Sequence, residues 1–155
     1  AGGIGAGGIG AGEADAVAAT FTEKTVDTPG GRILVAEDNA INIMVVRTIL
    51  EKSGYSVVTV SDGSAALEEL SRNHFDLVLM DISMPGVDGV TATRRVRAGE
   101  VAEANRDIPI VAVTAHAMAG DRESFMEAGM TDYLSKPYSR GNVLKAVADN
   151  LARGR

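Results

Sequence analysis

The sequence contains no cysteine and no tryptophan, and it has only two histidines. It can therefore form neither a disulfide nor a thiolate zinc site, and it offers little material for an imidazole metal cluster. No apolar run approaches the roughly 20 residues that a membrane span needs, and the first residues lack the basic region and apolar core of a signal peptide. We expect a soluble, cytoplasmic segment without direct membrane contact, any membrane anchor of a parent chain lying outside it.

Basic residues are also few, with 15 Lys and Arg against 21 Asp and Glu and a formal net charge of −6. Nucleic-acid binding draws its affinity from Lys and Arg that neutralise phosphates, so we expect no nucleic-acid partner. The composition, 45% hydrophobic and 23% charged, is typical of a globular protein with an aliphatic core. The 155 residues suit one domain of ordinary size, whose partners are proteins or cations.

The first 31 residues differ from the rest in composition. Residues 1–12 repeat the unit Ala-Gly-Gly-Ile-Gly, and the stretch up to Gly31 shows no sustained apolar period. We interpret residues 1–31 as a flexible linker, native or an added leader, and residues 32–153 as the folded domain. Residues 3–8 match the dinucleotide-binding pattern G-x-G-x-x-G, but that motif needs a strand before it and a helix after it, and neither is indicated.

From Arg32 onward, short β-branched runs alternate with segments of helical period. The predicted strands are residues 33–36, 56–60, 77–80, 110–113 and 132–135. The predicted first helix has Ile41, Val45 and Ile49 on one apolar face with Met44 beside them; the others start near 62, 90, 119 and 139. Five strands alternating with five helices predict the α/β class, with right-handed crossovers and a parallel sheet covered on both faces.

Ligands of such sheets bind at the carboxyl ends of the strands. The residues at those ends are Glu37 and Asp38, then Asp81, Thr114 and Lys136. Three neighbouring carboxylates repel unless a cation joins them, and oxygen ligands without Cys or His suit Mg²⁺ or Mn²⁺. An Asp81 carboxylate beside such an ion can act as a nucleophile toward phosphorus, with Lys136 and Thr114 contacting phosphate oxygens. The pattern therefore predicts a phosphoryl-transfer site.

Taken singly, each of these residues has an ordinary structural explanation. A strand-end aspartate is commonly a cap or turn former, a lysine before proline is commonly a surface charge, and a strand-end threonine commonly satisfies backbone groups. Their joint placement at one edge of one sheet favours the site.

Four ordered segments carry a resemblance to a known family: residues 35–39 (VAEDN), 79–89 (LMDISMPGVDG), 113–118 (VTAHAM) and 132–137 (DYLSKP). The region from about Arg32 to Leu151 resembles the response-regulator receiver domain of two-component signalling, and it is most similar to receiver domains of hybrid sensor histidine kinases. The resemblance implies a flavodoxin-like (βα)5 doubly wound sheet with strand order 2-1-3-4-5.

The resemblance also implies a role for each matching position. Asp81 is expected to accept the phosphoryl group of a phosphohistidine, and Lys136 is expected to contact that group. The Lys136-Pro137 peptide is expected to be cis, an isomer that X-Pro bonds adopt at little cost. The Mg²⁺ ligands are expected to be Glu37, Asp38, Asp81 and the Ser83 backbone carbonyl. The expected switch residues are Thr114 and Tyr133, and the expected modulatory residues are Ser83, His116 and Asn39.

Phosphorylation is expected to have one of two uses. It either switches protein contacts, or the phosphoryl group passes to a histidine phosphotransfer protein that docks on the first helix near Asn42, Ile43 and Val46. The expected partners are a histidine kinase domain, in cis or in trans, and such a phosphotransfer protein, with the chain a monomer or weak dimer. Alone, the domain would catalyse only its own phosphorylation and dephosphorylation, while a parent chain would be a hybrid histidine kinase. One alternative is a phosphate-independent pseudo-receiver that only binds proteins. A haloacid-dehalogenase-type phosphatase is disfavoured, because Ser83 stands where its second aspartate is needed.

Overall fold

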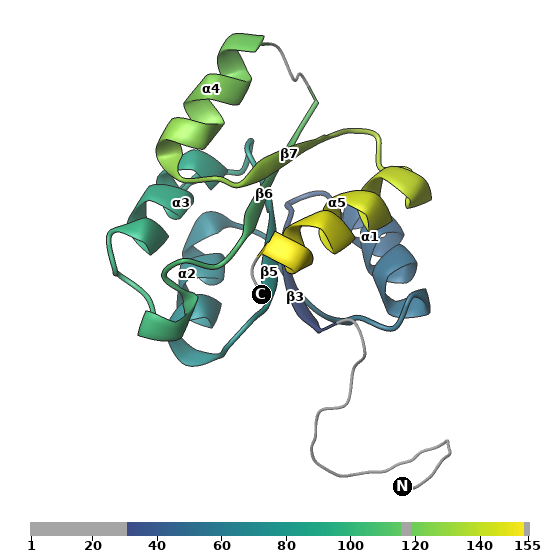
Figure 1. Cartoon of the computed structure of the whole chain (residues 1–155), viewed down its shortest axis with the longest axis horizontal. Coiled ribbons are helices and arrows are strands. Elements are labelled where there is room, and N and C mark those ends of the chain that lie inside the picture. The colour runs from purple at the N-terminus through teal and green to yellow at the C-terminus, as the bar shows by residue number, and fades with distance from the viewer. Residues whose placement is uncertain (1–30, 116–118, 154–155) are drawn as a thin grey trace, which may run out of the picture. The chain divides into compact units, whose positions relative to one another are not determined.

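The computed structural model describes residues 31–115 and 119–153 (Figure 1). The leader predicted for residues 1–31 and the modulatory residue His116 thus lie outside the described residues, Gly31 excepted. Among the described helices, none has the length and apolar character that crossing a bilayer requires.

The core of the domain is one five-stranded parallel sheet. Its strands in chain order are β3 (Arg32–Ala36), β4 (Ser56–Val60), β5 (Leu77–Asp81), β6 (Ile110–Thr114) and β7 (Asp132–Ser135). In space they follow the order β4-β3-β5-β6-β7, which is 2-1-3-4-5 in chain order. The predicted strand order and α/β class are therefore confirmed.

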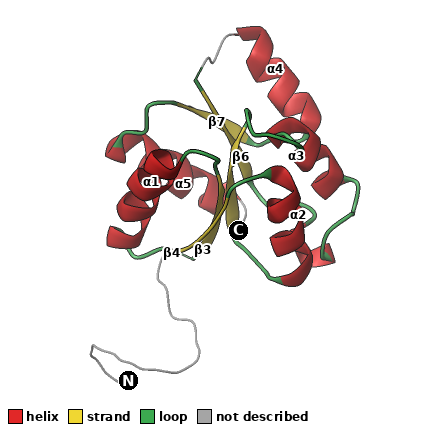
Figure 2. Cartoon of the chain, turned by 180° about the vertical axis from the view of Figure 1, so that it is seen from behind, coloured by secondary structure: helices red, strands yellow, loops and turns green. Residues whose placement is uncertain are grey.

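Five helices cover the two faces of the sheet: α1 (Ala40–Lys52), α2 (Gly63–Arg72), α3 (Gly89–Arg97), α4 (Ala119–Ala128) and α5 (Arg140–Arg153). Figure 2 shows α1 and α5 on one face and α2, α3 and α4 on the other. A 3-10 turn, η1 (Glu103–Asn105), lies within the polar segment that follows α3. This is the predicted doubly wound arrangement.

Alternate strand residues supply the two apolar layers, because successive side chains of a strand point to opposite faces. Leu34, Val78 and Ile110 pack in one buried cluster with residues of α2, α3 and α4. Ile33, Leu77 and Val111 pack in the other with residues of α1 and α5. Both faces of the central strands are buried, which is why these strands are apolar along their whole length.

Of the apolar face predicted for the first helix, only Ile49 packs against the core. Ile41 is 71% exposed, Met44 67% and Val45 39%, whereas Val46 and Leu50 are fully buried. Of the residues predicted for a docking surface on this helix, Val46 is buried and unable to contact a partner, whereas Asn42 and Ile43 are half-buried. Because α1 is apolar around most of its circumference, several stripes fit a helical period, and packing against β3, β4 and α5 selects the buried one.

Side-chain caps fix the starts of three helices. The side chain of Asp62 accepts the N–H of Ala65 at 2.7 Å, and that of Asp88 accepts the N–H of Thr91 at 2.8 Å. The side-chain oxygen of Asn39 accepts hydrogen bonds from the backbone N–H groups of Ile41 and Asn42 in the first turn of α1, at 2.9 and 3.0 Å. A side-chain acceptor satisfies donors that a helix start leaves unpaired, so each cap fixes where its helix leaves the sheet.

Gly89, the first residue of α3, lies directly against the end of β5. A Cβ atom built there would collide with the carbonyl oxygen of Asp81 and come within 3.1 Å of the Cα of Ile82. The absence of a side chain at Gly89 therefore lets α3 start close to the strand end that carries Asp81.

Replacing Gly89 with alanine should consequently destabilise the domain. We expect Gly89→Ala to lower the free energy of unfolding in urea by about 1–3 kcal/mol, because the backbone around Asp81 must shift to admit the methyl group. Gly141→Ala is the control, since a Cβ there meets nothing within 4 Å. It should be neutral or slightly stabilising, because alanine favours the helix over glycine. Equal stability of the two variants would contradict the close contact at Gly89.

Candidate functional site

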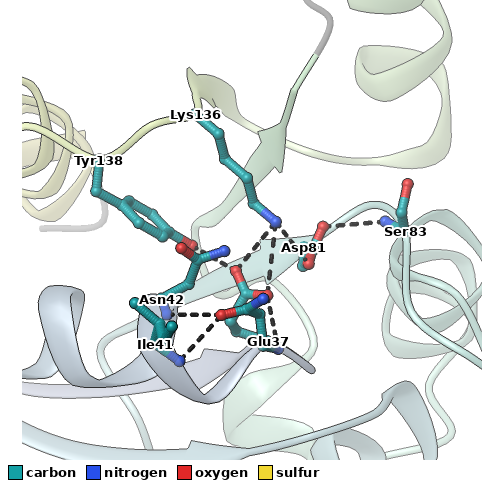
Figure 3. Close-up of polar contacts among 8 residues, drawn as sticks. Glu37, Ile41, Asn42, Asp81, Ser83, Lys136 and Tyr138 are labelled. Atoms are coloured by element: carbon teal, nitrogen blue, oxygen red, sulfur yellow. Dashed lines mark hydrogen bonds and ion pairs between the residues drawn. The ribbon is translucent and has the colours of Figure 1, made fainter.

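Three of the predicted site residues, Glu37, Asp81 and Lys136, converge at the carboxyl edge of the sheet (Figure 3). Asp81 is the last residue of β5, Glu37 follows β3, and Lys136 follows β7. Parallel strands end at the same edge, so residues up to 99 positions apart in the chain become direct neighbours.

Lys136 bridges the two buried acids. Its Nζ atom lies 3.0 Å from Asp81 Oδ2 and 3.2 Å from Glu37 Oε1. The side chain of Glu37 is 0% exposed, that of Asp81 2% and that of Lys136 21%. A buried carboxylate needs a partner, and here two carboxylates share one amine.

Further donors hold each acid. The backbone N–H of Ser83 donates to Asp81 Oδ1 at 3.0 Å, and the backbone N–H of Asn39 donates to Glu37 Oε2 at 3.0 Å. The hydroxyl of Tyr138 donates to Glu37 Oε1, also at 3.0 Å. Both oxygens of both carboxylates thus have a hydrogen-bond donor, which fixes their orientations.

Burial and mutual contact shift the pKa values of the group in different directions. Burial is the largest influence on the pKa of Asp81 and raises it; Lys136 and the Ser83 amide offset part of the rise, and Glu37 adds to it. Burial also raises the pKa of Glu37, but the Asn39 amide, Asp81 and Lys136 outweigh it, and the net shift is downward. Folding therefore disfavours the ionised form of Asp81 and favours that of Glu37.

The two remaining groups keep their protons. Burial lowers the pKa of Lys136, but its hydrogen bonds to Asp81 and Glu37 outweigh this effect and the net shift is upward. Burial and the charge of Glu37 raise the pKa of the Tyr138 hydroxyl far above its usual value. The amine therefore stays charged and the phenol stays a donor.

Glu37, Asp38 and Asp81 form an acidic cluster suited to a cation. Each offers one carboxylate oxygen, and these oxygens lie within 4.8 Å of one another. Within residues 31–115 and 119–153, no other group of three such residues comes this close. Oxygen donors without His or Cys are the ligands that Mg²⁺ prefers, so the donor set fits this ion.

Four other predicted residues lie in the described part of the chain: Thr114, Tyr133, Asn39 and Ser83. Thr114, 8% exposed, ends β6, and its carbonyl accepts the N–H of Lys136 at 2.8 Å. Tyr133 is half-buried in β7, with the guanidinium of Arg122 5.5 Å from its ring centre. The side chain of Asn39 is used as the α1 cap, and Ser83 lies next to Asp81 through its amide.

Sequence reasoning missed Tyr138. Its position directly after Lys136-Pro137 was the available signal, because a residue so near a site lysine can reach the same edge. The expected cis peptide at Lys136-Pro137 is present.

Comparison with known proteins assigns the chain to a family. The family model for the response regulator receiver domain matches residues 33–148, which is most of the folded region. The chain belongs to this family. It is a receiver domain of two-component signalling, as the sequence motifs predicted.

Curated relatives include both large kinases and small regulators. The chain is 46% identical over 116 residues to the sensor protein GacS of Pseudomonas syringae, an alignment that covers 75% of this chain and 13% of that protein. It is 36% identical over 119 residues to the polar-differentiation response regulator DivK of Brucella abortus, covering 77% of this chain and 94% of the regulator. The chain therefore spans a small part of GacS and nearly all of DivK.

A solved structure gives the same fold. The receiver domain of a sensor histidine kinase from Pseudomonas aeruginosa PAO1 superposes with a TM-score of 0.72 at 41% identity, over 79% of this chain and 98% of that one. That structure is described as having a magnesium ion coordinated in its active site cleft.

The burial of Asp81 leads to a stability prediction. A raised pKa in the folded state means that folding disfavours the ionised carboxylate, so the neutral, isosteric Asp81→Asn should unfold at a higher temperature at neutral pH in EDTA. We expect a gain of a few degrees, measured by circular dichroism. Adding Mg²⁺ should raise the unfolding temperature of the wild type and raise that of the variant less, because one ligand is lost.

Asp38→Asn is the matched comparison, since Asp38 belongs to the same cluster but is exposed. It should reduce the Mg²⁺-dependent rise with little effect in EDTA. A lower unfolding temperature of Asp81→Asn in EDTA would contradict the proposed cost of burying Asp81.

Proposed function

We propose that the domain is a phosphoacceptor, and that Asp81 receives a phosphoryl group from a phosphohistidine in a Mg²⁺-dependent reaction. One observation carries this proposal: a carboxylate that is 2% exposed ends the central strand with a lysine amine at 3.0 Å and two further acids beside it. A purely structural buried aspartate needs a partner such as the amine, but two further acids beside it only add repulsion.

Each residue of the site has a separate role in the proposed phosphoryl transfer. A carboxylate oxygen of Asp81 attacks phosphorus, the P–N bond breaks, and its electron pair returns to the imidazole of the donor. When bound by Glu37, Asp38, Asp81 and the Ser83 carbonyl, Mg²⁺ supplies charge neutralisation and a position for a phosphoryl oxygen. Lys136 lies where its ammonium can pair with another phosphoryl oxygen, and the Thr114 hydroxyl can donate to a third.

The new acyl phosphate adds negative charge at an edge already crowded with acids. We propose that Thr114 and Tyr133 respond by changing position, and that this changes which protein the surface of α4, β7 and α5 binds. Transfer onward to a histidine phosphotransfer protein is the other use of the same group. Both outcomes require phosphorylated Asp81, whereas a pseudo-receiver would bind its partner without it.

We propose that the first helix carries a docking surface beside the site. We define the α1 patch as the exposed residues Ile41, Met44 and Val45. The helix starts directly after Asn39, whose amide contacts Glu37, so this patch lies next to the acidic cluster. Because a sensor histidine kinase such as GacS of Pseudomonas protegens contains a similar segment, we propose a histidine kinase domain, in cis or in trans, as the partner, acting in the cytoplasm.

Phosphorylation by a small donor tests the chemistry. With acetyl phosphate and Mg²⁺, the wild type should gain the mass of one phosphoryl group, removable by hydroxylamine as expected of an acyl phosphate. The gain should disappear in EDTA and in Asp81→Asn. Asp88→Asn is the control: Asp88 follows β5 too, and asparagine preserves its cap on α3, so phosphorylation should be unchanged. An equal mass gain on Asp81→Asn, or none on the wild type, refutes the phosphoacceptor proposal.

Docking can be separated from chemistry with a charged substitution in the α1 patch. Met44→Glu should reduce phosphotransfer from the autophosphorylated kinase portion of Pseudomonas protegens GacS at least tenfold, because a buried unpaired charge at an interface costs several kcal/mol. Phosphorylation by acetyl phosphate should not change. Met126→Glu, which alters an exposed methionine of α4, should leave both rates unchanged. Equal protein-to-protein transfer by wild type and Met44→Glu would exclude the α1 patch.

A further inference from the structure

Tyr138 contacts the acidic cluster, yet no step of the proposed chemistry uses it. Its ring packs at the edge of the apolar cluster between the sheet and helices α1 and α5. Its hydroxyl donates to Glu37 Oε1 at 3.0 Å, and Figure 3 shows the side chain reaching Glu37 from the end of the chain segment that carries Lys136. The core thus fixes the ring, and the ring delivers a donor to a carboxylate that is 0% exposed.

The other bonds of Glu37 show what this donor contributes. The Asn39 amide holds Oε2 at 3.0 Å, and Lys136 Nζ lies 3.2 Å from Oε1 and 3.5 Å from Oε2. Lys136 is also bound to Asp81 at 3.0 Å, so its hold on Glu37 is shared. Among the described residues, Tyr138 is therefore the donor that fixes Oε1 independently of Lys136.

We propose that Tyr138 is a positioning residue of the cation site, whose hydroxyl fixes the orientation of the Glu37 carboxylate and so favours Mg²⁺ over larger cations. Mg²⁺ demands a near-ideal octahedral arrangement, whereas Ca²⁺ accepts variable geometry and ligand number. Partners that orient a ligand typically contribute 10- to 100-fold to metal affinity. A carboxylate held from two sides serves the ion with the stricter geometry. This inference rests on the proposed cation site.

The test compares two cations on one conservative variant. Mg²⁺ and Ca²⁺ are titrated by calorimetry into the full chain without a phosphodonor, for the wild type and for Tyr138→Phe. The variant keeps the ring and loses the hydroxyl, and an unchanged circular dichroism spectrum verifies its fold. We expect the dissociation constant for Mg²⁺ to rise about tenfold, and that for Ca²⁺ to rise by a clearly smaller factor.

Two further variants separate positioning from packing. Tyr55 packs against the same apolar cluster, so Tyr55→Phe is a matched loss of a hydroxyl and should leave both dissociation constants unchanged. In a Glu37→Ala background, Tyr138→Phe should weaken Mg²⁺ binding no further, because no carboxylate remains to be oriented.

Three results would overturn the inference: an unchanged Mg²⁺ dissociation constant for Tyr138→Phe, an equal loss for Mg²⁺ and Ca²⁺, or a loss that persists without Glu37. In each case a wild type that binds Mg²⁺ and accepts a phosphoryl group leaves the proposed function intact. A wild type that binds no Mg²⁺ would remove the proposed function and the inference together.

Discussion

Lys136 donates to two carboxylates that the fold buries almost completely, Asp81 at 3.0 Å and Glu37 at 3.2 Å. Two such acids repel each other, and taking their charges out of water is costly, so the shared amine stabilises both in their buried positions. The charges at this edge are still unbalanced, because one ammonium faces two buried acids and the exposed Asp38 beside them. This deficit of positive charge makes the edge suited to a divalent cation, and it makes the same edge a source of instability when no cation is bound.

Rigid backbone surrounds the site and keeps the like-charged groups close together. Asp81 ends a strand buried on both faces, and its Oδ1 is held by the amide two residues later in the chain. The start of α3 presses against the same strand end through Gly89, where no side chain intervenes. The acids are therefore held by strand ends and helix starts, elements that cannot relax to separate like charges.

The acidic cluster and the α1 patch are joined by a few residues. The amide of Asn39 binds Glu37 while its side chain caps α1, so one residue holds both the acid and the helix that carries the exposed patch. Exposing Ile41 and Met44 costs favourable burial, and exposed apolar residues that lie together are typical of a protein interaction site. The same stretch of chain thus joins the proposed cation site to the proposed partner contact.

The sequence by itself determined the class of fold, the family and the residues at the strand ends. Apolar runs alternating with helical periods fix a parallel sheet, and the ends of parallel strands meet at one edge whatever the details of packing. Only the tertiary structure decided which side of α1 is buried, because that helix is apolar on several sides and its contacts with the sheet select Val46 and Leu50. Only the tertiary structure showed that the Tyr138 hydroxyl reaches Glu37, 101 positions away in the chain. Periodicity reports the direction of a side chain relative to its own element, and a contact between distant elements depends on how those elements pack.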